Sequence, residues 1–129
     1  MANVLYAKGR EAFLTGNIDW AGDDIKVALV DTGVYTYAAG HQYHSELSGI
    51  IALSANLTTK TTTDGVADAD PVTFFGVVGA QSEALVIYKD TGVSGTSPLI
   101  AFIDSATGLP VTPNSGDIIV QWSDGANKI

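Results

Sequence analysis

The sequence predicts an all-β protein, mainly β with one or two short helices, folded as an antiparallel β-sandwich or a jelly-roll-like arrangement. Apolar runs of about five residues lie between clusters of Gly, Pro, Asp and Asn, which is typical of strands and not of helices. Roughly seven to nine such runs occur, with a turn signal about every eight to twelve residues, as in sandwiches. A parallel α/β sheet would instead need a helix between successive strands.

At the N-terminus, residues 1–24 are expected to form an arm that contains a helix and a turn-rich bridge, and residues 25–129 a β-sandwich domain. The helix is predicted over residues 3–15, where the apolar side chains of Leu5, Ala12 and Phe13 fall on one face that we expect to be packed. Asn3 is a suitable N-cap, and Gly16 stands where a left-handed helix stop belongs. The pattern leaves open whether this helix docks on its own domain or on a neighbouring molecule. Strands are expected only within the second range.

Strands are predicted at residues 25–31, 50–53, 57–63, 72–75, 84–88, 99–103 and 117–122. Two of the three runs in the C-terminal third are apolar on both faces, so we expect central strands covered from both sides. The Thr-rich run that contains Lys60 suits an exposed edge strand. A short helix is predicted over residues 40–47, and Asp64-Gly65 is a tight-turn signal.

Composition excludes several classes of partner. The chain has 6 basic and 14 acidic residues, a formal net charge of −8, and its basic residues are scattered along the sequence. Because no basic patch exists to neutralise phosphates, nucleic acid and anionic membranes are poor partners. No apolar run approaches the roughly 18 residues of a membrane span, and no signal-peptide pattern is present. Cysteine is absent, so neither disulfides nor thiolate metal sites are expected, and we expect a soluble protein made in the cytoplasm.

Two stretches contain the residue types of a metal site. They are His41, His44 and Glu46, and Asp64, Asp68 and Asp70. The histidines have i, i+3 spacing, unlike the i, i+4 pair of zinc proteases, and the chain has no further His or Cys to complete a zinc site. The aspartates lack the residue order and closing Glu of an EF-hand loop. Surface histidines and an acidic solvated turn are therefore the favoured interpretations, and no metal or other cofactor is expected.

Aromatic residues suggest a further alternative. Trp20 and Trp122, with five tyrosines in the chain, could form a sugar-binding platform. In a β-rich domain such residues more often fill the core or an interface. A Gly-x-Ser-x-Gly nucleophile elbow and a phosphate-binding loop are both absent, so the sequence does not predict an enzyme and offers no catalytic residues.

Several segments resemble a family of small virion structural proteins from tailed bacteriophages. The matching stretches are residues 5–6, 13–16, 18–20 and 25–33, residues 63–68, residues 84–92, and residues 103–104, 107–114 and 125–128. These residues form strands and turns, so they indicate a family more than a task. The resemblance implies a capsid decoration (cement) protein, with a tail or baseplate component as the alternative. It carries over no catalytic residue.

A decoration protein would lie on the capsid surface of the virion and bind the lattice of the major capsid protein. The resemblance also implies a homo-oligomer, with a trimer favoured, because three-fold positions of a shell multiply weak contacts. The acidic surface agrees with this expectation, since it would keep free copies apart before assembly. A carbohydrate-binding module for adhesion, using Trp20 or Trp122, is the alternative from another class.

Overall fold

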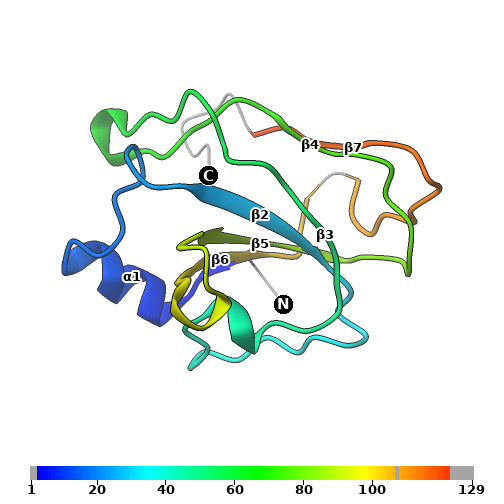
Figure 1. The fold of residues 1–129 in the computed structure, drawn as a ribbon, viewed down its shortest axis with the longest axis horizontal. Helices are drawn as coiled ribbons and strands as arrows, with labels where there is room; N and C mark the ends of the chain where they lie inside the picture. Colours follow the sequence, from blue (N-terminus) through cyan, green and yellow to red (C-terminus); the bar gives the residue numbers. More distant parts are fainter. Residues whose placement is uncertain (1–2, 107, 123–129) are drawn as a thin grey trace.

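The fold is given by a computed structural model that describes residues 3–106 and 108–122. The larger sheet is antiparallel, with five strands in the order β1-β6-β5-β2-β3 (Figure 1). Their bounds are Val4–Leu5 for β1, Leu99–Ile103 for β6, Ala84–Lys89 for β5, Ile25–Val30 for β2 and Ile50–Leu53 for β3. A smaller antiparallel sheet pairs β4 (Val72–Phe74) with β7 (Ile118–Val120). The prediction of an all-β antiparallel fold is confirmed.

Helical structure is limited. The described residues contain one α-helix, α1 (Ala7–Leu14), and three 3-10 turns, which are η1 (His44–Glu46), η2 (Thr63–Gly65) and η3 (Ser94–Thr96). None of these helices is long and apolar enough to cross a membrane. The predicted strands at residues 50–53 and 99–103 have the bounds that the structure gives them.

The central strands are buried on both faces, as their apolar runs predicted. Successive side chains of a strand point to opposite faces, and in β2 both sets are apolar except for Lys26 near its start. Ile25, Val27 and Leu29 face a core layer that also contains residues of β4 and β7. Ala28 and Val30 face a second layer on the other side of the sheet. The two sheets therefore pack against a shared core, and Figure 1 shows β4 and β7 lying over β2 and β5.

The second core layer is closed by the segment between β2 and β3. Tyr35 and Leu47 come from that segment, and Tyr6, which has no exposed surface, comes from the start of the chain. The hydroxyl oxygens of Tyr6 and Tyr35 lie 2.8 Å apart, so the polar ends of both buried rings are satisfied. Tyr6 lies between β1 and α1, so the N-terminal segment is part of the core.

The predicted helix over residues 3–15 is wrong at its start. Val4 and Leu5 instead form β1, which pairs with Phe102 and Ala101 of β6. Asn3 does not cap the helix; its Oδ1 accepts hydrogen bonds from the backbone N–H groups of residues 104 and 105, each at 2.9 Å. Tertiary pairing outweighs the local helical pattern here. The prediction that strands occur only after residue 24 fails for the same reason.

The helix end is as predicted, and its docking partner is now defined. Gly16 has φ +78°, the left-handed conformation of a helix stop. α1 packs on β6 of the same chain through its buried Gly9 and Ala12. A Cβ atom at residue 9 would lie 2.5 Å from the carbonyl oxygen of Leu99. Only glycine therefore lets the helix backbone approach the strand this closely.

Two further elements differ from prediction. Residues 57–63 form no strand; Thr61 and Asp68 make an isolated bridge, and Thr59 has φ +52°. The Asp64-Gly65 turn, with φ +55° and +75°, is confirmed and folds the Thr-rich run back within a few residues, before a ladder can form. Residues 40–47 form only the 3-10 turn η1, because the Glu46 carboxylate accepts hydrogen bonds from two preceding backbone N–H groups and closes a single turn.

Candidate attachment surface

The histidine cluster predicted as a possible metal site is occupied by other contacts. His41 Nδ1 lies 2.7 Å from the Tyr35 hydroxyl. The His44 ring packs on Tyr88 with ring centroids 4.5 Å apart, and burial lowers the pKa of this imidazole. The Glu46 carboxylate accepts from the backbone N–H groups of residues 42 and 43, at 2.7 and 3.0 Å. These three side chains therefore make separate structural contacts around η1 and do not converge on one point.

The acidic stretch is similarly divided. Asp70 accepts a 2.7 Å hydrogen bond from the Thr59 hydroxyl, and Asp68 pairs with Thr61 through its backbone. Asp64 lies at the tip of the turn that joins these two arms. Within the described parts of the chain, no three His, Cys, Asp or Glu side chains gather where a metal ion could sit.

The tryptophans lie in or against the core. Trp20 is 5% exposed, and its indole N–H donates to the carbonyl oxygen of Asp68 at 3.3 Å. Trp122 packs against the same core layer and is partly buried. Neither ring is an open platform for sugar stacking, because such a platform needs an exposed aromatic face.

A chain of hydrogen bonds among aromatic residues was not predicted. It runs from Tyr6 through Tyr35 to His41, with contacts of 2.8 and 2.7 Å. Burial is the main cause that raises the pKa of both tyrosine hydroxyls, and it raises the pKa of Tyr88 to about 12. Tyr6 is 29 residues from Tyr35, whereas Tyr35 and His41 are six residues apart and lie in an irregular segment, so no helical or strand period marks the set.

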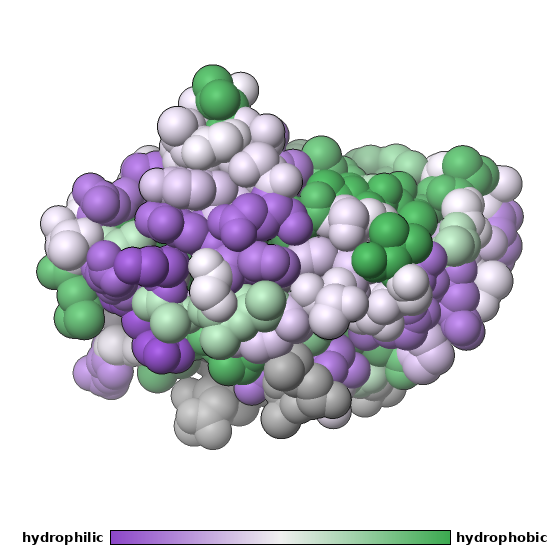
Figure 2. Space-filling model, turned by 90° about the horizontal axis from the view of Figure 1, so that it is seen from below, coloured by the Kyte–Doolittle hydropathy of each residue, from purple (hydrophilic) through white to green (hydrophobic). Residues whose placement is uncertain are grey.

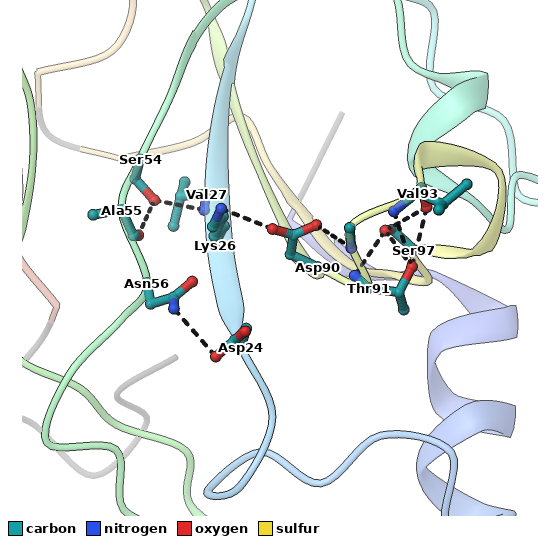
Figure 3. Close-up of polar contacts among 11 residues, drawn as sticks. Asp24, Lys26, Val27, Ser54, Ala55, Asn56, Asp90, Thr91, Val93 and Ser97 are labelled. Atoms are coloured by element: carbon teal, nitrogen blue, oxygen red, sulfur yellow. Dashed lines mark hydrogen bonds and ion pairs between the residues drawn. The ribbon is translucent and has the colours of Figure 1, made fainter.

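The tripeptide Asp-Thr-Gly occurs at residues 31–33 and 90–92, and each copy forms a turn at the end of a strand. After β2 the Asp31 carboxylate accepts from Gly33 N–H at 2.8 Å, and after β5 the Asp90 carboxylate accepts from Gly92 N–H at 2.9 Å. Figure 3 shows Lys26 of β2 reaching Asp90, with a 2.7 Å ion pair between them. This contact, followed by the Gly92 hydrogen bond, lowers the pKa of the Asp90 carboxyl. The turn after β5 thus ties β2 to β5, and the Asp90 carboxylate is already engaged by Lys26 and Gly92.

A concave, largely apolar groove of about 530 Å³ lies beside α1. We call it the α1 groove. Its lining residues come from β1, α1, residues 18–20, the turn at residues 62–67, and strand β6. Its apolar lining consists mainly of Leu5, Phe13, Ile18, Trp20, Val66 and Ile100. Leu5 is 46% exposed and Phe13 is 37% exposed, so the two side chains remain open to a partner although they belong to secondary structure.

A second apolar surface lies at the opposite edge of the five-stranded sheet. Strand β3 is uncharged, and it is the outermost strand on that side. Large exposed hydrophobic residues on β3 and on the adjoining segments are Leu53, Val34 and Val78, at 51%, 61% and 64% exposure. We call this surface the β3 edge. Figure 2 shows hydrophobic residues gathered toward the right-hand end of the face seen from below, whereas the left half is mainly hydrophilic.

The positive charges of the described chain are engaged internally. Lys8 pairs with Glu11, Lys26 with Asp90 and Lys89 with Asp23. The other two described cations donate to backbone carbonyls, Arg10 to residue 5 and Lys60 to residue 23. The unbalanced charge on the surface is therefore negative.

Comparison with protein-family models gave no match to this chain, and a search of curated proteins gave none either.

Sequence reasoning did not identify the α1 groove. Leu5 and Phe13 were predicted to lie on the packed face of a longer helix, and Trp20 was considered as a sugar platform. The groove forms because Leu5 of β1 stays partly exposed and because the segment after the Asp64-Gly65 turn adds Val66 to the same lining as Phe13. Its residues are separated by up to 96 positions, from Leu5 to Ala101, so no periodicity in the sequence marks it.

Proposed function

We propose that this protein is a phage virion structural protein, a capsid decoration (cement) protein that binds the lattice of the major capsid protein and stabilises the head. The resemblance of the segments within residues 5–33 and 84–128 to small virion proteins supports this function. A small all-β scaffold with packed core layers on both faces of its larger sheet supports it as well, because an attachment protein needs rigid surfaces more than moving parts.

The observation that carries the proposal is the presence of two apolar surfaces at opposite edges of one sheet. The α1 groove adjoins β1, whereas the β3 edge lies four strand spacings away, which is about 19 Å at about 4.8 Å per spacing. Exposed apolar patches on small proteins usually mark contacts with other proteins. Two of them on one rigid body suit a molecule that bridges neighbouring subunits.

The charge distribution is compatible with this role. The net charge of −8 makes free copies repel one another at long range and favours solubility before assembly. With the described cations paired internally, the surface presents no basic patch for nucleic acid.

The role predicts that phage particles lacking this protein assemble but lose their genomes at lower temperature than complete particles. Each bound copy at a hundredfold excess over its Kd would stabilise its site by about 2.7 kcal/mol, and the shell repeats that site many times. The measurement is DNA release on heating, read with an intercalating dye, and adding back the purified protein should restore the transition.

An unrelated acidic protein at the same concentration is the control for add-back. Heat resistance that is unchanged without the protein, combined with missing or inactive tails, would replace the decoration role by a tail or baseplate role. Copy number distinguishes the same two roles, since a decoration protein is present in hundreds of copies per particle and a tail-tip protein in a handful.

We also propose that the protein forms a homo-oligomer, most simply a trimer at a three-fold position of the shell. A closed trimer needs two different surface patches on each copy. The β3 edge is one suitable patch, because an uncharged outer strand readily pairs with another chain. The α1 groove is then left to contact the shell, and the trimer as a whole bridges neighbouring capsid subunits. We expect light scattering at tens of micromolar to give the mass of a trimer, about three times 13.4 kDa. A monomer in solution together with a monomer at each site on the particle would contradict this.

A further inference from the structure

We propose that the α1 groove binds a short apolar segment of the major capsid protein that has a lysine or arginine beside it. The identity of the partner rests on the proposed function. The chemistry of the segment rests on the lining of the groove and on the charges at its rim.

The groove is rigid and apolar. Its helix wall is fixed because Gly9 brings α1 against the backbone of β6. Its opposite wall is held by the two backbone hydrogen bonds between Thr61 and Asp68, at 3.0 and 3.1 Å, and by the indole of Trp20 donating to the same residue. A volume of about 530 Å³ lies in the range of about 300–1,000 Å³ typical of preformed pockets, which accommodates a few side chains and not a whole helix.

The rim of the groove carries free negative charge. Most carboxylates of the described chain accept a hydrogen bond or make an ion pair, as Asp23, Asp70 and Asp117 do. Asp19 and Asp64 differ: within residues 3–106 and 108–122 their side chains make no such contact. Asp19 lines the groove, and Asp64 lies between the lining residues Thr62 and Gly65. Among the described residues, one carboxylate without a partner, Asp19, thus lies in the lining of the groove, and a second, Asp64, is adjacent in sequence to the lining residue Gly65.

The combination of an apolar lining and an acidic rim determines which kind of segment can bind in the groove. An apolar segment fills the floor, and a neighbouring cation meets Asp19 or Asp64, which fixes the direction of the segment and speeds its encounter. A second copy of this chain fits poorly, because its net charge is −8 and its described cations already have internal partners. Arg10, the cation nearest in sequence to the groove residue Phe13, is one of these engaged cations, because its guanidinium donates to the Leu5 carbonyl oxygen at 3.1 Å.

The test measures binding of the purified protein to empty shells of the phage that encodes it. Phe13→Ser removes an aromatic side chain from the groove and is expected to weaken binding about thirtyfold, as for a central interface residue. Leu14→Ser is the matched control, because this neighbour is apolar and 88% exposed but does not line the groove. It should bind as the wild type does. Melting temperatures of both variants show that the fold is kept.

Charge is tested separately. Asp19→Asn with Asp64→Asn is expected to weaken binding about fivefold at low salt and to flatten its salt dependence, because rim charges contribute modestly and are screened. Asn is tolerated at the positive φ of residue 64. Glu11→Gln makes the same type of charge change on the exposed surface of α1, where Glu11 pairs with Lys8, and should leave binding unchanged.

The occupant is identified by placing the photo-crosslinking residue p-benzoylphenylalanine at position 13 and, as a control, at the 66% exposed Ile119. The crosslink from position 13 should contain an apolar peptide of the capsid protein with Lys or Arg nearby. Wild-type binding to shells together with unchanged binding of Phe13→Ser, or a crosslink to a second copy, overturns this inference and leaves the proposed function intact. Failure of the wild-type protein to bind shells overturns both.

Discussion

Replacing Gly9 by alanine is expected to destabilise the protein by about 1–3 kcal/mol, the usual cost of inserting atoms into a packed contact. A Cβ at this position would lie 2.5 Å from the Leu99 carbonyl oxygen and 3.1 Å from the Ile100 Cα. Both atoms belong to the backbone of a central strand, so neither can move aside cheaply. The helix or the strand must shift, and the α1 groove would shift with it.

Intrinsic helix propensity alone predicts the opposite sign for Gly9→Ala, so the sign of the measured change distinguishes the two effects. In an exposed helix, Gly→Ala would stabilise by up to about 1 kcal/mol. Urea unfolding measures the difference, and Gly95→Ala is the control, because a Cβ at residue 95 meets no atom within 4 Å. A Gly9→Ala protein more stable than the wild type would mean that α1 does not approach β6 as closely as described.

Alkaline unfolding is expected to begin near the ordinary pKa of tyrosine and to be cooperative. Burial raises the pKa of Tyr88 from 10.0 to about 12, and it raises the pKa of Tyr6 and Tyr35 as well. In each case the folded state holds the proton more tightly than the unfolded state. This contribution to stability is complete below pH 10 and is lost as pH rises through the folded pKa.

The size of the effect follows from the shift. For Tyr88 alone, which is 3% exposed, a rise of the pKa from 10.0 to about 12 corresponds to roughly 3 kcal/mol, a large part of a typical stability of about 5–15 kcal/mol. The absorbance of tyrosinate should therefore rise together with the loss of the β-sheet circular dichroism signal. Tyr6→Phe should move the midpoint of unfolding to higher pH, because it removes one of the buried hydroxyls whose ionisation drives unfolding. Tyrosines that ionise gradually while the sheet signal persists would refute the prediction.

Much of the sheet could be predicted because its signals are local. The strands at 50–53 and 99–103 and the Asp64-Gly65 turn are defined by short apolar runs and by residues that tolerate positive φ. The N-terminal strand could not be predicted, because a strand of two residues is too short to show the alternation of apolar and polar side chains. Val4 and Leu5 are a strand only because β6 offers them an edge.

The candidate surface was harder to predict than the fold, for a physical reason. A groove is defined by side chains that come together only in the fold, and Phe13 of α1 shares the lining with Val66 from a distant turn. Helical periodicity placed Phe13 on the packed face of α1, yet the helix meets β6 through Gly9 and Ala12. The smallest side chains make the contact, which leaves the larger one outside.

The strand order has a consequence for biosynthesis. Val4 pairs with Phe102, so the first strand of the chain finds its neighbour only after almost the whole sheet-forming sequence has left the ribosome. Pairings between distant segments also make folding slow, typically milliseconds to seconds for β-rich domains. Because Leu5 and Ile100 line the same groove, that groove does not exist on an incomplete chain. Truncated translation products would thus lack the surface by which finished copies are proposed to reach the shell, and could not occupy their places on it.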